Sequence, residues 1–185
     1  MKQLLYTIQH INAYREMKRT GVLRASEDFL MMDGAFRSAY GYMAEQLKKR
    51  VGKPPCGVHY PVWAWHTWEG KRGRRDLRFS GYAPRGTEMV QIEFEAEEES
   101  FLLSDFDAWH FVLNDRYIGE WEELRPILNA PVTDLSALKA MTERSWEKIF
   151  DLQCPLTAEK DISLQACLWE IPLSAVKRVW HFTAK

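Results

Sequence analysis

Residues 90–95 read VQIEFE, and this alternating stretch is the strongest indication of fold class in the chain of 185 residues. Val90, Ile92 and Phe94 are apolar, and polar or acidic residues separate them. Successive side chains of a strand point to opposite faces, so the pattern predicts a strand with one buried face and one acidic, solvated face. Such two-sided strands are typical of antiparallel sheets.

Four other segments are rich in apolar, aromatic and β-branched residues and are predicted to be strands: 3–8, 60–68, 164–171 and 176–182. Residues 69–73 contain two glycines and are expected to form a turn. Residues 76–80 are then the expected return strand of a hairpin.

Helices are predicted where apolar residues recur every three or four positions. The expected helices run from Ile11 to a stop at Gly21, from a cap at Asp33 to the basic residues 48–50, from a capping box of Ser104 and Asp107 to Leu113, and over Asp134–Phe150. Because helices lie between strands and no linker interrupts them, the chain is predicted to be a single α+β domain over residues 1–185. Its sheet should be mixed or antiparallel, with flanking helices.

Composition excludes several classes of protein. The hydrophobic fraction is 46% and the net charge is −1, so the chain should be packed, and it lacks a global attraction to nucleic acid or membranes. The three cysteines have no metal-knuckle spacing, and no metal site is predicted. No apolar run approaches the ~20 residues that span a bilayer, so a cytoplasmic protein without membrane contact is expected.

The segment YPVWAWHTW at residues 60–68 is followed by a run of basic residues. Aromatic rings beside guanidinium groups suit a base stacked on a ring with its phosphate held by arginine. The alternative is that the tryptophans belong to the core and the basic residues to a solvated turn. The candidate ligand-binding residues in this region are Trp63, Trp65, Arg74, Arg75 and Arg78.

A second candidate cluster contains Asp105, Asp107 and His110. Asp107 and His110 are three residues apart, and on a helix they would share a face. A histidine–carboxylate pair can act as a general acid and base. The same residues also suit an ordinary helix N-terminus, where an aspartate complements the dipole.

Five segments resemble a bacterial family catalogued as a domain of unknown function, number 3841. They are GVLRA at 21–25, YPVWAW at 60–65, DLR at 76–78, LSDFD at 103–107 and SWE at 145–147. The resemblance covers nearly the full length, and it implies no activity.

Two further segments are similar to ADP-ribosyltransferases of the DNA-modifying toxin type. Those proteins open with Tyr-His-Ile-Thr-His, a helix and Gly-Leu, and YTIQH at 6–10 precedes GVL at 21–23 here. Their catalytic glutamate lies in a Gln-Ala-Glu run, where this chain has Gln-Ala-Cys at 165–167, with Glu170 nearby. The resemblance implies a related fold and NAD as a ligand. It points to Tyr6, His10 and Glu170 as catalytic residues and to Arg24 as a ligand contact.

Three hypotheses follow. The chain handles a nucleotide such as NAD, either as an enzyme or as a degenerate relative of one. Alternatively, it binds nucleic acid or a phosphorylated ligand through an aromatic and basic hairpin, or it is a protein-interaction module with a tryptophan-rich surface. The oligomeric state stays open.

Overall fold

The computed structural model describes residues 1–26, 34–79, 81–130 and 134–185. Six strands form one sheet in the order β5-β6-β3-β1-β4-β8, and all of its pairings are antiparallel. These strands are β1 (Lys2–His10), β3 (Val62–Thr67), β4 (Glu88–Glu97), β5 (Leu102–Asp105), β6 (Leu164–Leu168) and β8 (Val176–Thr183). The predicted α+β class and antiparallel sheet are confirmed.

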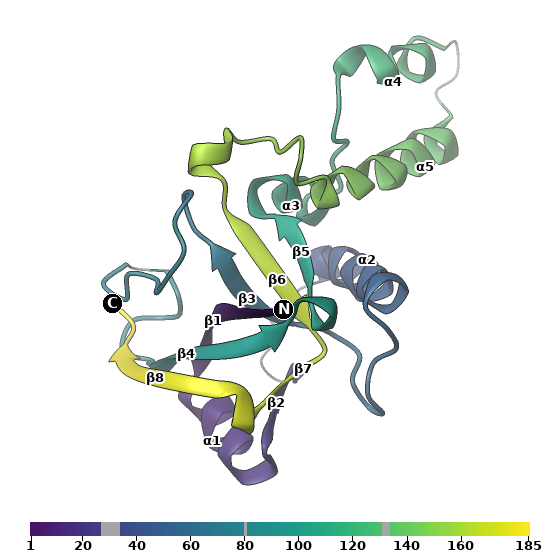
Figure 1. Cartoon of the computed structure of the whole chain (residues 1–185). Helices are drawn as coiled ribbons and strands as arrows, with labels where there is room; N and C mark the ends of the chain where they lie inside the picture. The colour runs from purple at the N-terminus through teal and green to yellow at the C-terminus, as the bar shows by residue number, and fades with distance from the viewer. Residues whose placement is uncertain (27–33, 80, 131–133) are drawn as a thin grey trace.

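The remaining elements surround this sheet. A two-stranded sheet pairs β2 (Val22–Arg24) with β7 (Glu170–Pro172). The helices are α1 (Ile11–Thr20), α2 (Gly34–Arg50), α3 (Phe106–Leu113), α4 (Trp121–Leu128) and α5 (Leu135–Ser145). Figure 1 shows α4 and α5 extending away from the sheet as an arm. Within the part of the chain that the structure describes, no helix has the length and apolar character needed to cross a membrane.

The large sheet consists of two halves that meet at one point. β1 pairs with β4 along its whole length, from Lys2 to His10. By contrast, the register between β1 and β3 comprises the single pair Tyr6 and Trp65. The half β8-β4-β1 and the half β3-β6-β5 therefore diverge beyond this pair, and Figure 1 shows them running in different directions.

Each face of the sheet is covered differently. On one face, residues of β1, β3, β4 and β6 pack with α1, β2 and β7 in one core, which includes Leu5, Ile92, Phe94, Met17 and Ile171. On the opposite face, α2 and α3 cover only the half β3-β6-β5. That second core includes Trp63, Cys167, Met43, Leu47 and Trp109.

Several local predictions were wrong. Residues 76–79 form a turn, in which the Phe79 N–H donates to the Asp76 carbonyl at 3.4 Å, so no return strand follows β3 there. Asp105 rather than Ser104 caps α3, and Ser104 lies in β5. The polar face of β4 is solvated only in part, since Gln91 is 0% exposed while the Glu95 side chain is 36% exposed. The predicted cap at Asp33 lies outside the described residues.

Two long elements are divided. The apolar run 164–171 ends as β6 at Leu168 and resumes as β7 at Glu170, which belongs to the small sheet. The predicted helix Asp134–Phe150 is α-helical only to Ser145, with Asp134 as its N-cap, and continues as a 3₁₀ helix over residues 146–150.

Candidate functional site

The described parts of the loop after β3, residues 68–79 and 81–86, contact β1 and β8 on the sheet face of Trp180 and Phe182. The Arg72 guanidinium anchors it by donating to main-chain carbonyls of β3 and β1 at 2.8 and 2.9 Å. The Arg74 guanidinium lies 5.1 Å from the centre of the Trp180 ring in β8. Gly73, between these arginines, has a φ of 124°, which side chains other than glycine rarely allow. The loop thus carries its basic residues to the sheet surface.

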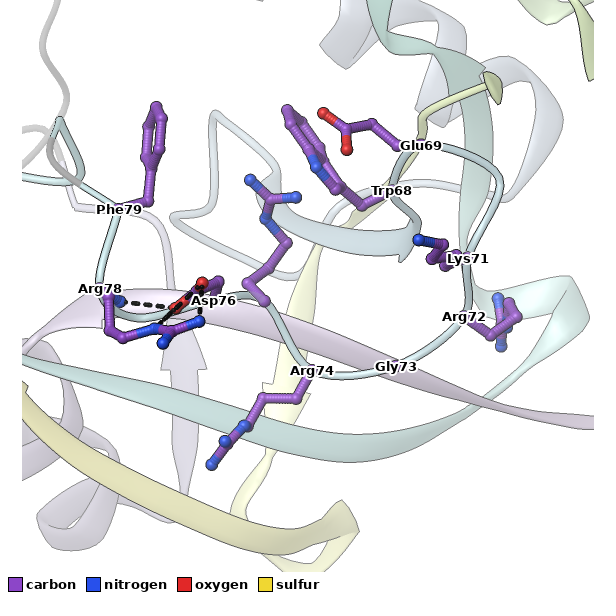
Figure 2. A pocket seen from close by; sticks show the side chains of 10 residues that line it. Trp68, Glu69, Lys71, Arg72, Gly73, Arg74, Asp76, Arg78 and Phe79 are labelled. Carbon is purple, nitrogen blue, oxygen red and sulfur yellow. Dashed lines mark hydrogen bonds and ion pairs between the residues drawn. The ribbon is translucent and has the colours of Figure 1, made fainter. Parts of the chain in front are cut away.

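Residues 68–79 of this loop enclose a basic hollow of about 640 Å³. Five of its lining side chains are basic and two are acidic. Figure 2 shows the paired Arg78 and Asp76 near Phe79, while Arg74 extends away from Trp68. The hollow therefore has a net positive charge and aromatic walls.

Some of these cations have partners of their own. The Arg78 guanidinium donates to both Asp76 carboxylate oxygens, at 3.0 and 2.9 Å, and these bonds hold the pKa of Asp76 at about 2. Lys71, Arg74 and Arg75 have no carboxylate within 4.0 Å among the residues that the structure describes. These three cations are the charges that a ligand could use.

Arg75 is the most unusual of them. It is only 7% exposed, and its guanidinium carbon lies 3.2 Å from the centre of the Trp68 ring and 5.1 Å from that of Trp65. Its Nε has no hydrogen-bond partner in the described part of the chain. Burial lowers the pKa of Arg75, and the Tyr82 hydroxyl and the Glu69 and Asp76 carboxylates act in the opposite direction, but an arginine stays charged at all physiological pH values. A buried cation without a carboxylate costs several kcal/mol, of which the aromatic contacts offset only a part.

A second space, the sheet-split cavity, opens where β1 and β3 diverge. Its volume is about 380 Å³. Its lining includes Ile8 and Gln9 of β1, Trp63 and Trp65 of β3, Gln165 of β6, Tyr40 of α2, Tyr82 of the loop and Arg24 of β2. Arg75 lines the hollow, and its guanidinium carbon lies 5.1 Å from the centre of the Trp65 ring, which lines the cavity, so this one contact links the walls of the two spaces.

Buried polar atoms on this sheet face lack partners. The Trp63 Nε1, the Gln165 Oε1 and the Ser104 Oγ have no hydrogen-bond partner within the described ranges, and neither do the two amide atoms of Gln91. A buried donor or acceptor that lacks a hydrogen bond lowers the stability of the fold by about 1–3 kcal/mol. Sequence reasoning missed Gln165 and Gln91 as functional candidates. The available signal was the single glutamine in the apolar run that begins at Leu164, whereas Gln91 alternates with acidic residues and gave no such signal.

The predicted catalytic residues do not converge. The Tyr6 pKa is raised by burial and by its hydrogen bond with Glu93. His10 caps α1, and its Nδ1 accepts from the Asn12 N–H at 3.1 Å. The Glu170 Oε2 accepts from the Arg24 Nε at 2.9 Å. Arg24 lines the sheet-split cavity, so its partner Glu170 lies next to a residue of the cavity wall. Tyr6 and His10 are not among the residues that line the cavity.

Cys167, which stands where the resemblance to the toxins would place the catalytic glutamate, is 0% exposed. It belongs to the core under α2 and α3, and burial raises the pKa of its thiol well above the usual value. This position therefore serves packing.

The second candidate cluster forms a helix terminus. Asp105 is 1% exposed and accepts from the N–H groups of Asp107 and Ala108 at 2.8 and 3.1 Å. Asp107 is hydrogen-bonded to the Thr157 hydroxyl, and the His110 Nδ1 lies 2.9 Å from the Phe106 carbonyl. No histidine–carboxylate pair is described here. Over the described ranges, no group of three or more His, Cys, Asp or Glu could hold a metal ion.

The chain belongs to a known protein family. The family model described as Domain of unknown function (DUF3841) matches residues 4–177, which is most of the chain. No curated protein and no solved structure matches it. The predicted membership is confirmed.

Proposed function

We propose that this member of the DUF3841 family binds a nucleotide-class ligand such as NAD, with its phosphates in the basic hollow and a ring in the sheet-split cavity. The observation that carries the proposal is Arg75, a nearly buried cation with no carboxylate within 4.0 Å in the described residues, which contacts Trp68 of the hollow and Trp65 of the cavity. A phosphate supplies the missing negative charge and accepts hydrogen bonds from a guanidinium in a fork geometry.

The dimensions and lining of the two spaces support the same ligand class. Volumes of about 640 and 380 Å³ lie within the usual range for small-molecule sites. Lys71 and Arg74 add positive charge in the hollow, and Trp65 and Tyr82 offer flat faces in the cavity. A base can stack on such rings while its phosphates remain among the arginines.

The location of Arg75 favours a small ligand over nucleic acid or a protein partner. A polymer backbone is usually bound by exposed cations along a groove, and its affinity falls steeply with salt. Arg75, by contrast, is 7% exposed and lines a hollow rather than an exposed groove. Exposed Trp121 and Leu135 lie on the arm, away from this site.

Turnover of the nucleotide is a separate part of the proposal. Glu170 is the candidate catalytic carboxylate, since its ion pair with Arg24 at 2.8 Å holds it beside the cavity. A carboxylate there could stabilise positive charge that develops on a ribose ring as the bond to nicotinamide breaks.

Isothermal titration calorimetry of NAD, ADP, adenosine and a single-stranded oligonucleotide, at two salt concentrations, tests the proposal. NAD and ADP should bind, and adenosine should bind at least tenfold more weakly, because it lacks phosphate. The variant Arg75→Met should lose about 10–100-fold in ADP affinity, as expected for a hydrogen bond to a charged group.

Arg125→Met is the matched control, since it removes one exposed arginine from α4, which is paired with Glu122. It should bind ADP like the wild type. Undiminished ADP binding by Arg75→Met, or binding of the oligonucleotide alone, would overturn the proposal.

A further inference from the structure

Gln165 has an unusual environment within the sheet. It lies in β6, opposite Trp65 of β3 and Ser104 of β5, so all three side chains share one sheet face. The Gln165 Oε1 is buried and has no hydrogen-bond partner in the described part of the chain, and the neighbouring Ser104 Oγ is in the same state. Gln165 lines the sheet-split cavity, and once its amide turns toward that cavity, a ligand there can supply the missing donor.

The cavity offers complementary surfaces for a flat heterocycle. Tyr40, Trp63, Trp65 and Tyr82 contribute aromatic rings to its lining. The Trp63 Nε1 is an unused donor, and the Gln165 Oε1 is an unused acceptor. The last side-chain torsion of a glutamine is soft, so the Gln165 amide can turn its oxygen or its nitrogen toward the cavity.

We infer that the base bound in the sheet-split cavity is adenine and that the Gln165 amide recognises its amino edge, an inference that rests on the proposed function. A glutamine amide pairs with adenine through two bonds: its oxygen accepts from the exocyclic amino group and its nitrogen donates to N7. Hypoxanthine has a carbonyl oxygen in place of the amino group, so the same edge carries two acceptors. One of these would face the Gln165 oxygen and be repelled.

Competition between ADP and IDP, measured by isothermal titration calorimetry on the wild-type protein, tests this inference. The two nucleotides carry the same phosphates and ribose, so the basic hollow binds them equally. A paired amide is expected to favour ADP by roughly 5–150-fold. The variant Gln165→Leu should bind ADP and IDP with equal affinity, while Gln153→Leu, a change at an exposed glutamine, should keep the preference for ADP.

Each outcome is decisive. Equal affinity of the wild type for ADP and IDP overturns the assignment of adenine and leaves the proposed function standing. A preference for ADP that persists in Gln165→Leu shows that another residue reads the base. Failure of both nucleotides to bind the wild type overturns the proposed function itself. The wild-type comparison holds even if Gln165→Leu fails to fold, which circular dichroism would reveal.

Discussion

Arg75→Met should make the protein more stable while it removes the proposed phosphate contact. The Arg75 side chain is 7% exposed, its Nε has no partner among the described residues, and no carboxylate there lies within 4.0 Å of it. Methionine has a similar length and no charge, so it can fill the same space against Trp68. A buried charge without a counter-ion is retained at a cost in stability, and such residues are concentrated at functional sites.

The expected gain can be worked from the contacts. Removing a buried cation relieves a desolvation penalty of several kcal/mol, of which the more distant Glu69 and Asp76 carboxylates offset a part. The stacked contact with Trp68, at 3.2 Å, is lost with it, and a cation–π contact of this kind contributes about 2 kcal/mol when desolvated. The net expectation is an unfolding free energy higher by about 1–3 kcal/mol, or roughly 2–10 °C in Tm for a chain of this size.

Urea denaturation followed by circular dichroism measures this difference directly. Arg72→Met is the contrasting variant, because the Arg72 guanidinium donates to two main-chain carbonyls at 2.8 and 2.9 Å. That variant should lose roughly 2–4 kcal/mol. If Arg75→Met instead loses 2 kcal/mol or more, the Arg75 guanidinium is a structural group, and the reasoning that assigns it to a ligand fails.

Three further changes have expected outcomes. Asp105→Ala should lower the unfolding free energy by about 2–4 kcal/mol in urea melts, because three main-chain N–H groups lose their acceptor. A loss under 1 kcal/mol would refute the role of Asp105 as the cap that stabilises α3. Burial lowers the His66 pKa to about 4 in the folded protein, so the unfolded chain binds more protons than the folded one between about pH 6.5 and 4. The unfolding free energy should therefore fall as the pH drops through this range. The fall in unfolding free energy with pH should be shallower in His66→Gln than in the wild type. Equal slopes in the two proteins would show that His66 does not cause the decline. Glu170→Gln should abolish NAD turnover in a nicotinamide-release assay. Its unfolding free energy should stay within about 1 kcal/mol of the wild type, because the ion pair of Glu170 with Arg24 is partly exposed. Full activity of this variant would exclude Glu170 as the catalytic carboxylate.

Local patterns predicted most of the fold. The alternation of Val90, Ile92 and Phe94 identified β4 correctly because that strand packs its apolar side against α1 and the small sheet. The pattern could not show that Gln91, on the other side, would be fully buried. Gln91 lies between Ile8 of β1 and Trp180 of β8 in the sheet, and tertiary pairings of this kind leave no period in the sequence. The division of 164–171 into β6 and β7 depends on tertiary pairing in the same way.

The candidate site could be predicted only in part. The grouping of tryptophans with arginines predicted a ligand-binding site, which stays a prediction; the structure places Trp65 on the cavity wall and Arg75 beside it. The sequence could not separate Arg75, which is buried, from Arg78, which is paired with Asp76 at the surface. The cavity itself arises where β1 and β3 part after Tyr6 and Trp65, and that divergence is a property of the assembled sheet.

The most direct measurement is a crystal structure of the protein with ADP. The ADP phosphates should lie within hydrogen-bonding distance of the Arg75 guanidinium in the basic hollow, with the base in the sheet-split cavity beside Trp65. ADP bound elsewhere, for example in the groove between α1 and β2, or crystals grown in saturating ADP that contain none, would contradict the proposed function.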